Sequence, residues 1–144
     1  MEGSIDVHAA PTGAGCSECE RGGSWWLHLR RCAACGHIGC CELSVRNHAA
    51  AHYRATGHRY VQSYEPGESW WWDYVSQKDT TGPDLAPPTS RPLGQASPGP
   101  RARVPADWQA QLLAREELDA QAASPAPSAS LRITESVNEP GSAL

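Results

Sequence analysis

Residues 16–58 read CSECERGGSWWLHLRRCAACGHIGCCELSVRNHAAAHYRATGH, with the pattern Cys-x2-Cys-x12-Cys-x2-Cys-x4-Cys-x7-His-x3-His-x5-His. Two cysteines separated by two residues hold a metal ion from a tight turn, and two such pairs at this separation are typical of zinc sites. Thiolate and imidazole favour Zn²⁺, and a structural zinc takes four protein ligands. The pattern therefore predicts two zinc ions per chain. The candidate ligands are Cys16, Cys19, Cys32, Cys35, Cys40, His48, His52 and His58.

The two histidines at positions 48 and 52 decide between catalysis and binding. They lie four residues apart in an alanine-rich stretch that favours a helix. The same spacing occurs in His-Glu-x-x-His zinc proteases, but Ala49 stands where their general-base glutamate must be. Disulfides or an iron–sulfur cluster would leave the histidines without a role. We therefore predict a zinc-binding module, not an enzyme.

The residues that build structure are concentrated in less than half of the 144-residue chain. All six Cys, five of the six His and five of the six Trp lie between Cys16 and Trp72, and there is no Phe. A domain this small buries little apolar surface and usually needs metal or disulfide links. Grouped cysteines in a cytoplasmic protein favour metal, and cytoplasmic is the predicted location because the N-terminus has no signal-peptide pattern.

Charge and hydropathy exclude two classes of partner. The net charge of −4 argues against nucleic acid, which needs a basic face. The pairs Arg30–Arg31 and Arg54–Arg59 are interpreted as solvated surface charge. No apolar run approaches the ~20 residues that a membrane span needs. The Ala-, Pro- and Arg-rich composition is typical of a high-GC bacterium.

Composition also divides the chain into segments. We predict a flexible lead over 1–13, the zinc finger over 14–78, and a Pro/Gly-rich linker over 79–104. A possible helix follows over 105–122, with Trp108 and Leu112 on one face, and a disordered tail over 123–144. Truncation after Lys78 is therefore expected to leave zinc content and melting temperature nearly unchanged.

Four stretches, Cys16–Cys19, Trp26–Leu29, Cys32–Cys40 and His48–His58, together resemble the UBP-type (ubiquitin carboxyl-terminal hydrolase-like) zinc finger in its small stand-alone bacterial form. The resemblance implies an α+β fold, a short twisted antiparallel sheet with one or two helices. It also implies how the ligands divide between the two ions. One zinc would take Cys16, Cys19, Cys40 and His48, and the other would take Cys32, Cys35, His52 and His58.

In that family a C-terminal Gly-rich, ubiquitin-like tail enters a cleft with aromatic walls. The resemblance implies that Trp26 and Trp70 match the walls, with Trp72 nearby, and that polar groups receive the terminal carboxylate. In this chain Arg46 and Arg54 are the candidates to substitute for the family's arginine in that role. Core packing is an equally good interpretation for Trp26 and Trp70, and the better one for Trp71. The alternative function is a structural or regulatory zinc protein without a tail pocket, which acts through its Pro-rich C-terminal region.

The sequence departs from the family pattern at two places. Glu42 stands where an arginine commonly faces the ligand tail, and its charge is expected to weaken binding of a carboxylate. Trp71 and Tyr74 stand where some members have the cysteine pair of a third zinc, so we expect two zinc ions. Cys41 has no place in the ligand scheme and is interpreted as a spectator thiol.

Overall fold

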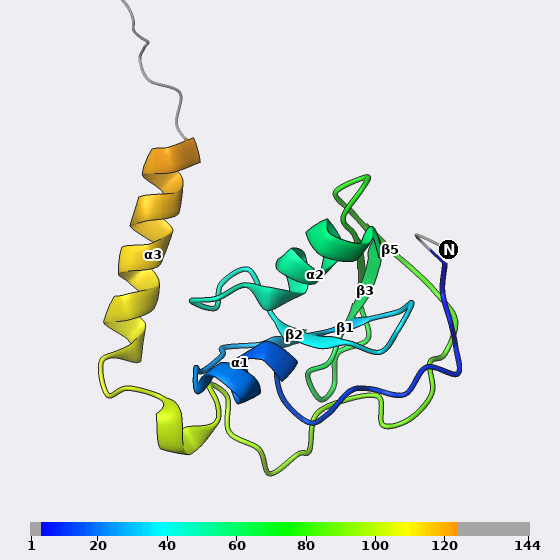
Figure 1. Ribbon diagram of the computed structural model, residues 1–144, viewed down its shortest axis with the longest axis horizontal. Helices are drawn as coiled ribbons and strands as arrows, with labels where there is room; N and C mark the ends of the chain where they lie inside the picture. Colours follow the sequence, from blue (N-terminus) through cyan, green and yellow to red (C-terminus); the bar gives the residue numbers. More distant parts are fainter. Residues whose placement is uncertain (1–3, 124–144) are drawn as a thin grey trace, which may run out of the picture. The chain divides into compact units, whose positions relative to one another are not determined.

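A five-stranded antiparallel sheet organises the computed structural model, which describes residues 4–123 (Figure 1). The strand order across the sheet is β2-β1-β3-β4-β5. This arrangement, with helices on the sheet, confirms the predicted α+β class. The strands are β1 (Leu29–Cys32), β2 (Ile38–Cys40), β3 (Tyr60–Ser63), β4 (Trp71–Asp73) and β5 (Lys78–Thr80).

Three α-helices and one 3₁₀ helix accompany the sheet: α1 (Ser17–Gly22), α2 (His48–Thr56), η1 (Arg101–Arg103) and α3 (Trp108–Ala123). In Figure 1, α2 lies over β1 and β2. The chain divides after Trp108 into two units, so that nearly all of α3 belongs to the second. Among residues 4–123, no helix has the length and apolar character needed to cross a membrane.

A close approach at Gly39 allows α2 to pack on the sheet. A Cβ atom at this position would lie 2.7 Å from the backbone nitrogen of Ala49 and 2.9 Å from the His37 ring. Both distances are shorter than any real Cβ contact, so a side chain here would push the helix away. Because α2 begins with His48 and also contains His52, this packing fixes the position of two predicted zinc ligands.

The core consists of two clusters, and three of the seven residues in the first are cysteines. Its members, all buried, are Cys16, Cys19, Trp26, Leu29, Ile38, Cys40 and Tyr64. The second cluster gathers Ala33, Trp71 and Leu85, against which Ile5, Val7 and Tyr60 pack. The core position predicted for Trp71 is confirmed, since only 3% of this residue is exposed.

The segments predicted as a flexible lead and a linker lie along the finger. In Figure 1 the blue lead and the green segment after β5 run side by side, and the Ala86 amide donates to the Val7 carbonyl at 2.9 Å. Leu85 is buried against Trp71. Residues 86–104, here named the strap, contact the finger as far as Arg103. A cut after Lys78 would remove Leu85 and uncover Trp71, a cost that composition does not show, so the outcome of that truncation stays a prediction.

Arg30 and Arg31 are buried, which corrects their interpretation as solvated charge. Successive residues of a strand point to opposite faces of the sheet, so β1 presents one arginine to each face. Arg31 donates to the Ala9 carbonyl at 2.8 Å and to the Pro88 carbonyl at 3.0 Å. Burial lowers the pKa of its guanidinium. Arg31 therefore joins the lead and the strap to the sheet.

We predict that Leu85→Ala lowers the free energy of unfolding by about 2–3 kcal/mol, because it leaves a cavity beside Trp71. Leu93→Ala is the matched control. Leu93 is 86% exposed, so its loss should cost less than about 0.5 kcal/mol. Denaturant unfolding of the full zinc-loaded chain measures both. Equal, small losses would show that the segment after β5 does not pack on the finger.

Candidate metal centres and aromatic pocket

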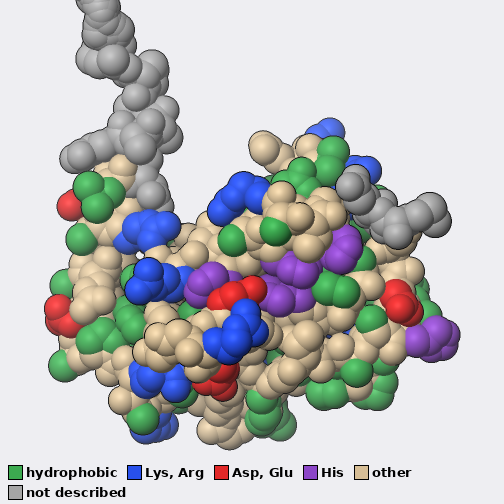
Figure 2. All heavy atoms as spheres, in the orientation of Figure 1, with side chains coloured by type: hydrophobic (Ala, Val, Ile, Leu, Met, Phe, Trp, Pro, Cys, Tyr) green, Lys and Arg blue, Asp and Glu red, His purple; other side chains and the backbone are tan. Residues whose placement is uncertain are grey.

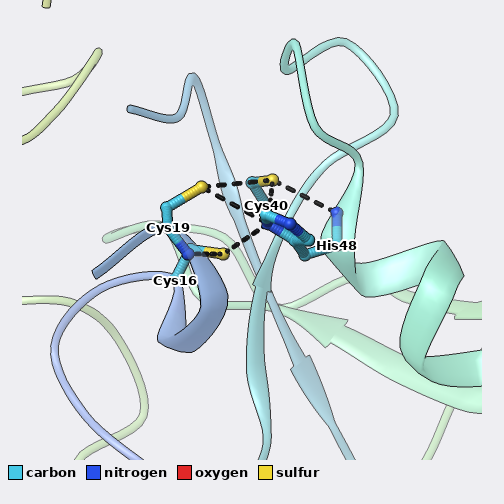
Figure 3. A group of neighbouring side chains, drawn as sticks. All are labelled: Cys16, Cys19, Cys40 and His48. Atoms are coloured by element: carbon cyan, nitrogen blue, oxygen red, sulfur yellow. Dashed lines mark hydrogen bonds between the residues drawn. The ribbon is translucent and has the colours of Figure 1, made fainter. Parts of the chain in front are cut away.

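The first metal centre joins α1 and α2 to the end of β2 (Figure 3). Cys16 caps α1, Cys19 lies within it, Cys40 ends β2, and His48 begins α2. The Nδ1 atom of His48 lies 3.2, 3.3 and 3.5 Å from the sulfurs of Cys16, Cys19 and Cys40. Zinc bonds of about 2.3 Å to sulfur and 2.0–2.1 Å to nitrogen give ligand separations of roughly 3.5–3.8 Å in a tetrahedron. The four groups therefore fit one zinc ion.

The second metal centre joins the β1–β2 turn to α2 and the residues after it. Its members are Cys32, Cys35, His52 and His58, whose ligand atoms all lie within 4.8 Å of one another. The Cys35 sulfur is 3.3 Å from Nε2 of His52, and the Cys32 sulfur is 3.5 Å from Nδ1 of His58. These separations again fit a tetrahedral zinc. The two clusters have the composition that the family resemblance implied.

A histidine outside both clusters links them. The His37 ring stacks on the His52 ring with centroids 4.0 Å apart, and its Nε2 lies 2.8 Å from both carboxylate oxygens of Glu18. Glu18 lies between the first two cysteine ligands, whereas His52 belongs to the second centre. Figure 2 shows histidine side chains gathered on this face. The carboxylate–imidazole contact fixes the ring that supports His52.

Burial and the clustering of the sulfurs determine the protonation of both centres when no metal is bound. Burial raises the pKa of the Cys32 thiol to about 12, and hydrogen bonding with Cys16 is the main cause that raises the pKa of Cys40 to about 12. Both sulfurs would keep their protons at neutral pH without a metal ion, whereas zinc stabilises the thiolate directly. Burial lowers the pKa of His52 to about 4, which keeps its imidazole in the neutral form that binds metal.

A pocket of about 700 Å³ lies on one face of the sheet, beside the second centre. Val61, Trp72 and Asp79 are in register across β3, β4 and β5, and Cys32 of β1 pairs with the same Val61. The sheet thus forms the floor of the pocket. Its lining residues are Arg30, Glu42, Val61, Trp70, Trp72, Tyr74 and Asp79.

Arg30 supplies the single positive charge among these lining residues. Its guanidinium carbon lies 4.5 Å from the centroid of the Trp70 ring, a cation–π contact. A guanidinium nitrogen lies 3.7 Å from the Glu42 carboxylate, which is largely exposed. Two interactions therefore hold Arg30 at the wall of the pocket, and the one with Glu42 faces solvent.

Comparison with known proteins agrees with this geometry. Residues 16–85 match the zf-UBP family, described as the Zn-finger in ubiquitin-hydrolases and other protein. The solution NMR structure of protein RPA1320 from Rhodopseudomonas palustris is similar, with 38% identity and a TM-score of 0.52 over 68% of this chain and 90% of that one. The chain belongs to the zf-UBP family. A search of curated proteins gave no match.

In this zf-UBP chain, the pocket on the sheet contains two of the three tryptophans predicted to bind a ligand. Trp70 and Trp72 line it, and Trp70 is 39% exposed. Trp26 is not among the lining residues, because it is fully buried in the sulfur-rich core. Its large ring fills a small core that contains no phenylalanine, the alternative that the sequence left open.

The cation that lines the pocket is Arg30, which the prediction from sequence did not name. Arg46 and Arg54 are exposed and do not line the pocket, whereas Arg30 does. The available signal was strand alternation in Leu29-Arg30-Arg31-Cys32, which places Arg30 on the same face as the zinc ligand Cys32. The adjacent arginines were instead interpreted as a surface pair.

Two further departures of the sequence have a structural explanation. Tyr74 lines the pocket and stacks on Tyr53 with centroids 4.9 Å apart, while Trp71 lies in the core. Burial, followed by the nearby Glu42 charge, raises the pKa of Tyr74 to about 12, so its phenol stays neutral. Within residues 4–123 there are two groups of Cys and His that fit a metal ion. Aromatic packing thus occupies the positions of the third-zinc cysteines.

We predict that Cys40→Ser leaves one zinc ion per chain, because it removes a ligand of the first centre. Structural zinc contributes on the order of 10 kcal/mol per site, so a sharp loss of stability should accompany the change. The neighbouring Cys41→Ser is the control. Cys41 is buried, lies 3.5 Å from the Ser44 hydroxyl, and belongs to neither cluster. Native mass spectrometry should count one zinc in the first variant and two in the second; two in both would refute the assignment.

Proposed function

We propose that this zf-UBP chain is a protein-interaction module that binds a C-terminal, Gly-rich peptide tail in the pocket between Trp70 and Trp72. The observation that carries the proposal is one cation, Arg30, held at the wall of a pocket that also presents three aromatic side chains. Arginine offers two parallel donors to a carboxylate, and flat indole rings pack well on peptide backbone. A residue without a side chain lets that backbone approach the rings closely.

Binding is favoured over catalysis by the donor sets. Each centre offers four protein ligands to its zinc, which is the closed arrangement of a structural site. A catalytic zinc instead keeps a position open for water. The pocket itself is lined by aromatic residues and by an arginine that is paired with a carboxylate. These features support a module whose partner is a protein or peptide.

Glu42 competes with the ligand in this proposal. In the free protein its carboxylate lies beside the Arg30 guanidinium, where the carboxylate of a peptide terminus would bind. Glu42 is largely exposed, so its pair with Arg30 is screened by water and weak. A tail carboxylate that enters between the indoles loses more water and forms a stronger bond. Glu42 therefore lowers the affinity without closing the pocket.

We predict that a peptide ending in Gly-Gly with a free carboxylate binds more tightly than its C-terminal amide, by about 1.5–3 kcal/mol, the range for a hydrogen bond to a charged group. Arg30→Gln should abolish this preference, and Trp70→Ala should weaken both peptides. Calorimetric titration of the zinc-loaded wild type and both variants with the two peptides measures the six affinities.

Substitution of Glu42 provides a second test. Glu42→Gln removes the competing charge and should raise the affinity for the free-acid peptide only. Glu42→Arg should raise it further. Arg54→Gln is the matched control, because Arg54 is exposed and does not line the pocket. If the wild-type chain and Glu42→Arg both fail to distinguish acid from amide, the pocket does not bind a chain terminus. A structural or regulatory role for the zinc protein would then replace the proposal.

A further inference from the structure

The strap, residues 86–104, pairs with the finger as an added edge strand would. Gly99 and Trp26 exchange two backbone hydrogen bonds, of 2.8 and 2.9 Å, in an isolated antiparallel bridge. The Ser97 hydroxyl donates to the Leu27 carbonyl at 2.7 Å, and the Arg91 amide donates to the Tyr64 carbonyl at 2.8 Å. An extended peptide recognised through its backbone makes contacts of this kind.

Two arginines of the strap meet carboxylates of the finger. Arg91 lies 3.2 Å from Glu65, a buried carboxylate. Arg103 lies 2.7 Å from Glu20, and its Nε donates to the Ser24 carbonyl at 2.8 Å. The strap is therefore a basic segment seated against acidic residues, with its arginines on either side of the Trp26–Gly99 bridge.

The strap's own side chains bury little apolar surface. Between residues 86 and 104 the single buried residue is Gly99, and Leu93 is 86% exposed. The strap supplies no ligand to either metal centre and no strand to the five-stranded sheet. Segments with few buried apolar contacts open at lower free energy than the core of a domain.

The closed strap also leaves polar atoms without partners. Within residues 4–123, three buried side-chain atoms lack a hydrogen bond: Nε1 of Trp26, Nε of Arg31 and Oε1 of Gln95. All three belong to this interface, since Gly99 covers the Trp26 ring, Arg31 bonds to Pro88, and Gln95 lies in the strap. The three atoms lie where the strap meets the finger, so lifting the strap would expose them to water.

We propose that the strap is a displaceable intramolecular ligand, and that its opening exposes an acceptor edge at residues 24–27 for an extended peptide with basic side chains. The edge offers the Trp26 amide and the carbonyls of Ser24, Trp26 and Leu27. Glu20 and Glu65 receive the basic side chains, and the Trp26 ring receives a residue as small as glycine. No strap residue lines the pocket of the proposed function, so failure of one proposal leaves the other unaffected.

Hydrogen exchange on the full zinc-loaded chain tests the opening. The amides of Trp26 and Gly99 should exchange at least about tenfold faster than the amide of Cys32, which bonds to the His37 carbonyl within the finger. Their rates should also depend little on low denaturant concentrations, because a local opening exposes little surface. If all three amides exchange at the same rate with the same denaturant dependence, the strap is a fixed layer and the proposal fails.

Gly99→Val in the full chain should open the acceptor edge. A Cβ at Gly99 would lie 2.7 Å from the Ala96 carbonyl oxygen and 3.2 Å from Nε1 of Trp26, whereas a Cβ at Gly94 would meet nothing within 4 Å. Gly94→Val is therefore the matched control. A synthetic peptide of residues 91–104 should bind Gly99→Val at least about tenfold more tightly than it binds wild type or Gly94→Val.

Zinc content separates the outcomes of this experiment. Gly99→Val should retain two zinc ions, as should a second variant, Arg103→Ala, which removes the contact with Glu20. Both variants should bind the peptide. Loss of zinc from both would show that the strap is integral to the finger, and retained zinc without peptide binding would show that the edge accepts nothing in trans; either result overturns the proposal.

Discussion

The two interleaved metal centres are the constraint on which the rest of the chain depends. Helix α2 contributes His48 to one centre and His52 to the other, so neither zinc can be satisfied without placing the whole helix. The cysteines come from the start of α1, from the end of β1 and the turn after it, and from the end of β2. Three of the seven residues in the first core cluster are sulfur ligands. In a domain with so little apolar core, metal coordination supplies the cohesion that burial cannot.

The two faces of the sheet have different surroundings. Its strands present Arg30 to the face that holds the aromatic pocket and Arg31 to the face that the lead and strap cover. Each arginine has partners suited to its environment. Arg30 meets an indole ring and an exposed carboxylate, while Arg31 meets backbone carbonyls under a layer of chain. A substitution at either position should therefore affect one face and spare the other.

Much of this architecture could be predicted from the sequence, because ligand chemistry is local. The spacing of Cys and His indicated two zinc sites, and the family resemblance divided the ligands between them as the structure does. The core position of Trp71 also followed, since so small a core needs a large ring. Residues 124–144 of the tail predicted over 123–144 lie outside the described part of the chain.

Other features depend on contacts that leave no periodic pattern. The strap is held by backbone hydrogen bonds and by two arginines, so its Pro- and Gly-rich composition resembles that of a linker. The burial of Trp26 under Gly99 depends on residues more than 70 positions away. Strand alternation places Arg30 on the face of Cys32, but the pocket on that face forms only through the register across β1, β3 and β4.

Zinc titration into the metal-stripped full chain tests most directly whether metal coordination creates the fold. If coordination creates the fold, the stripped chain lacks dispersed amide resonances from β1–β5, and these appear with added zinc and reach full intensity at two ions per chain. The first equivalent alone should not complete the sheet, because α2 links both centres. A stripped chain that already shows the dispersed spectrum, or one whose spectrum is complete after a single zinc, would contradict the account.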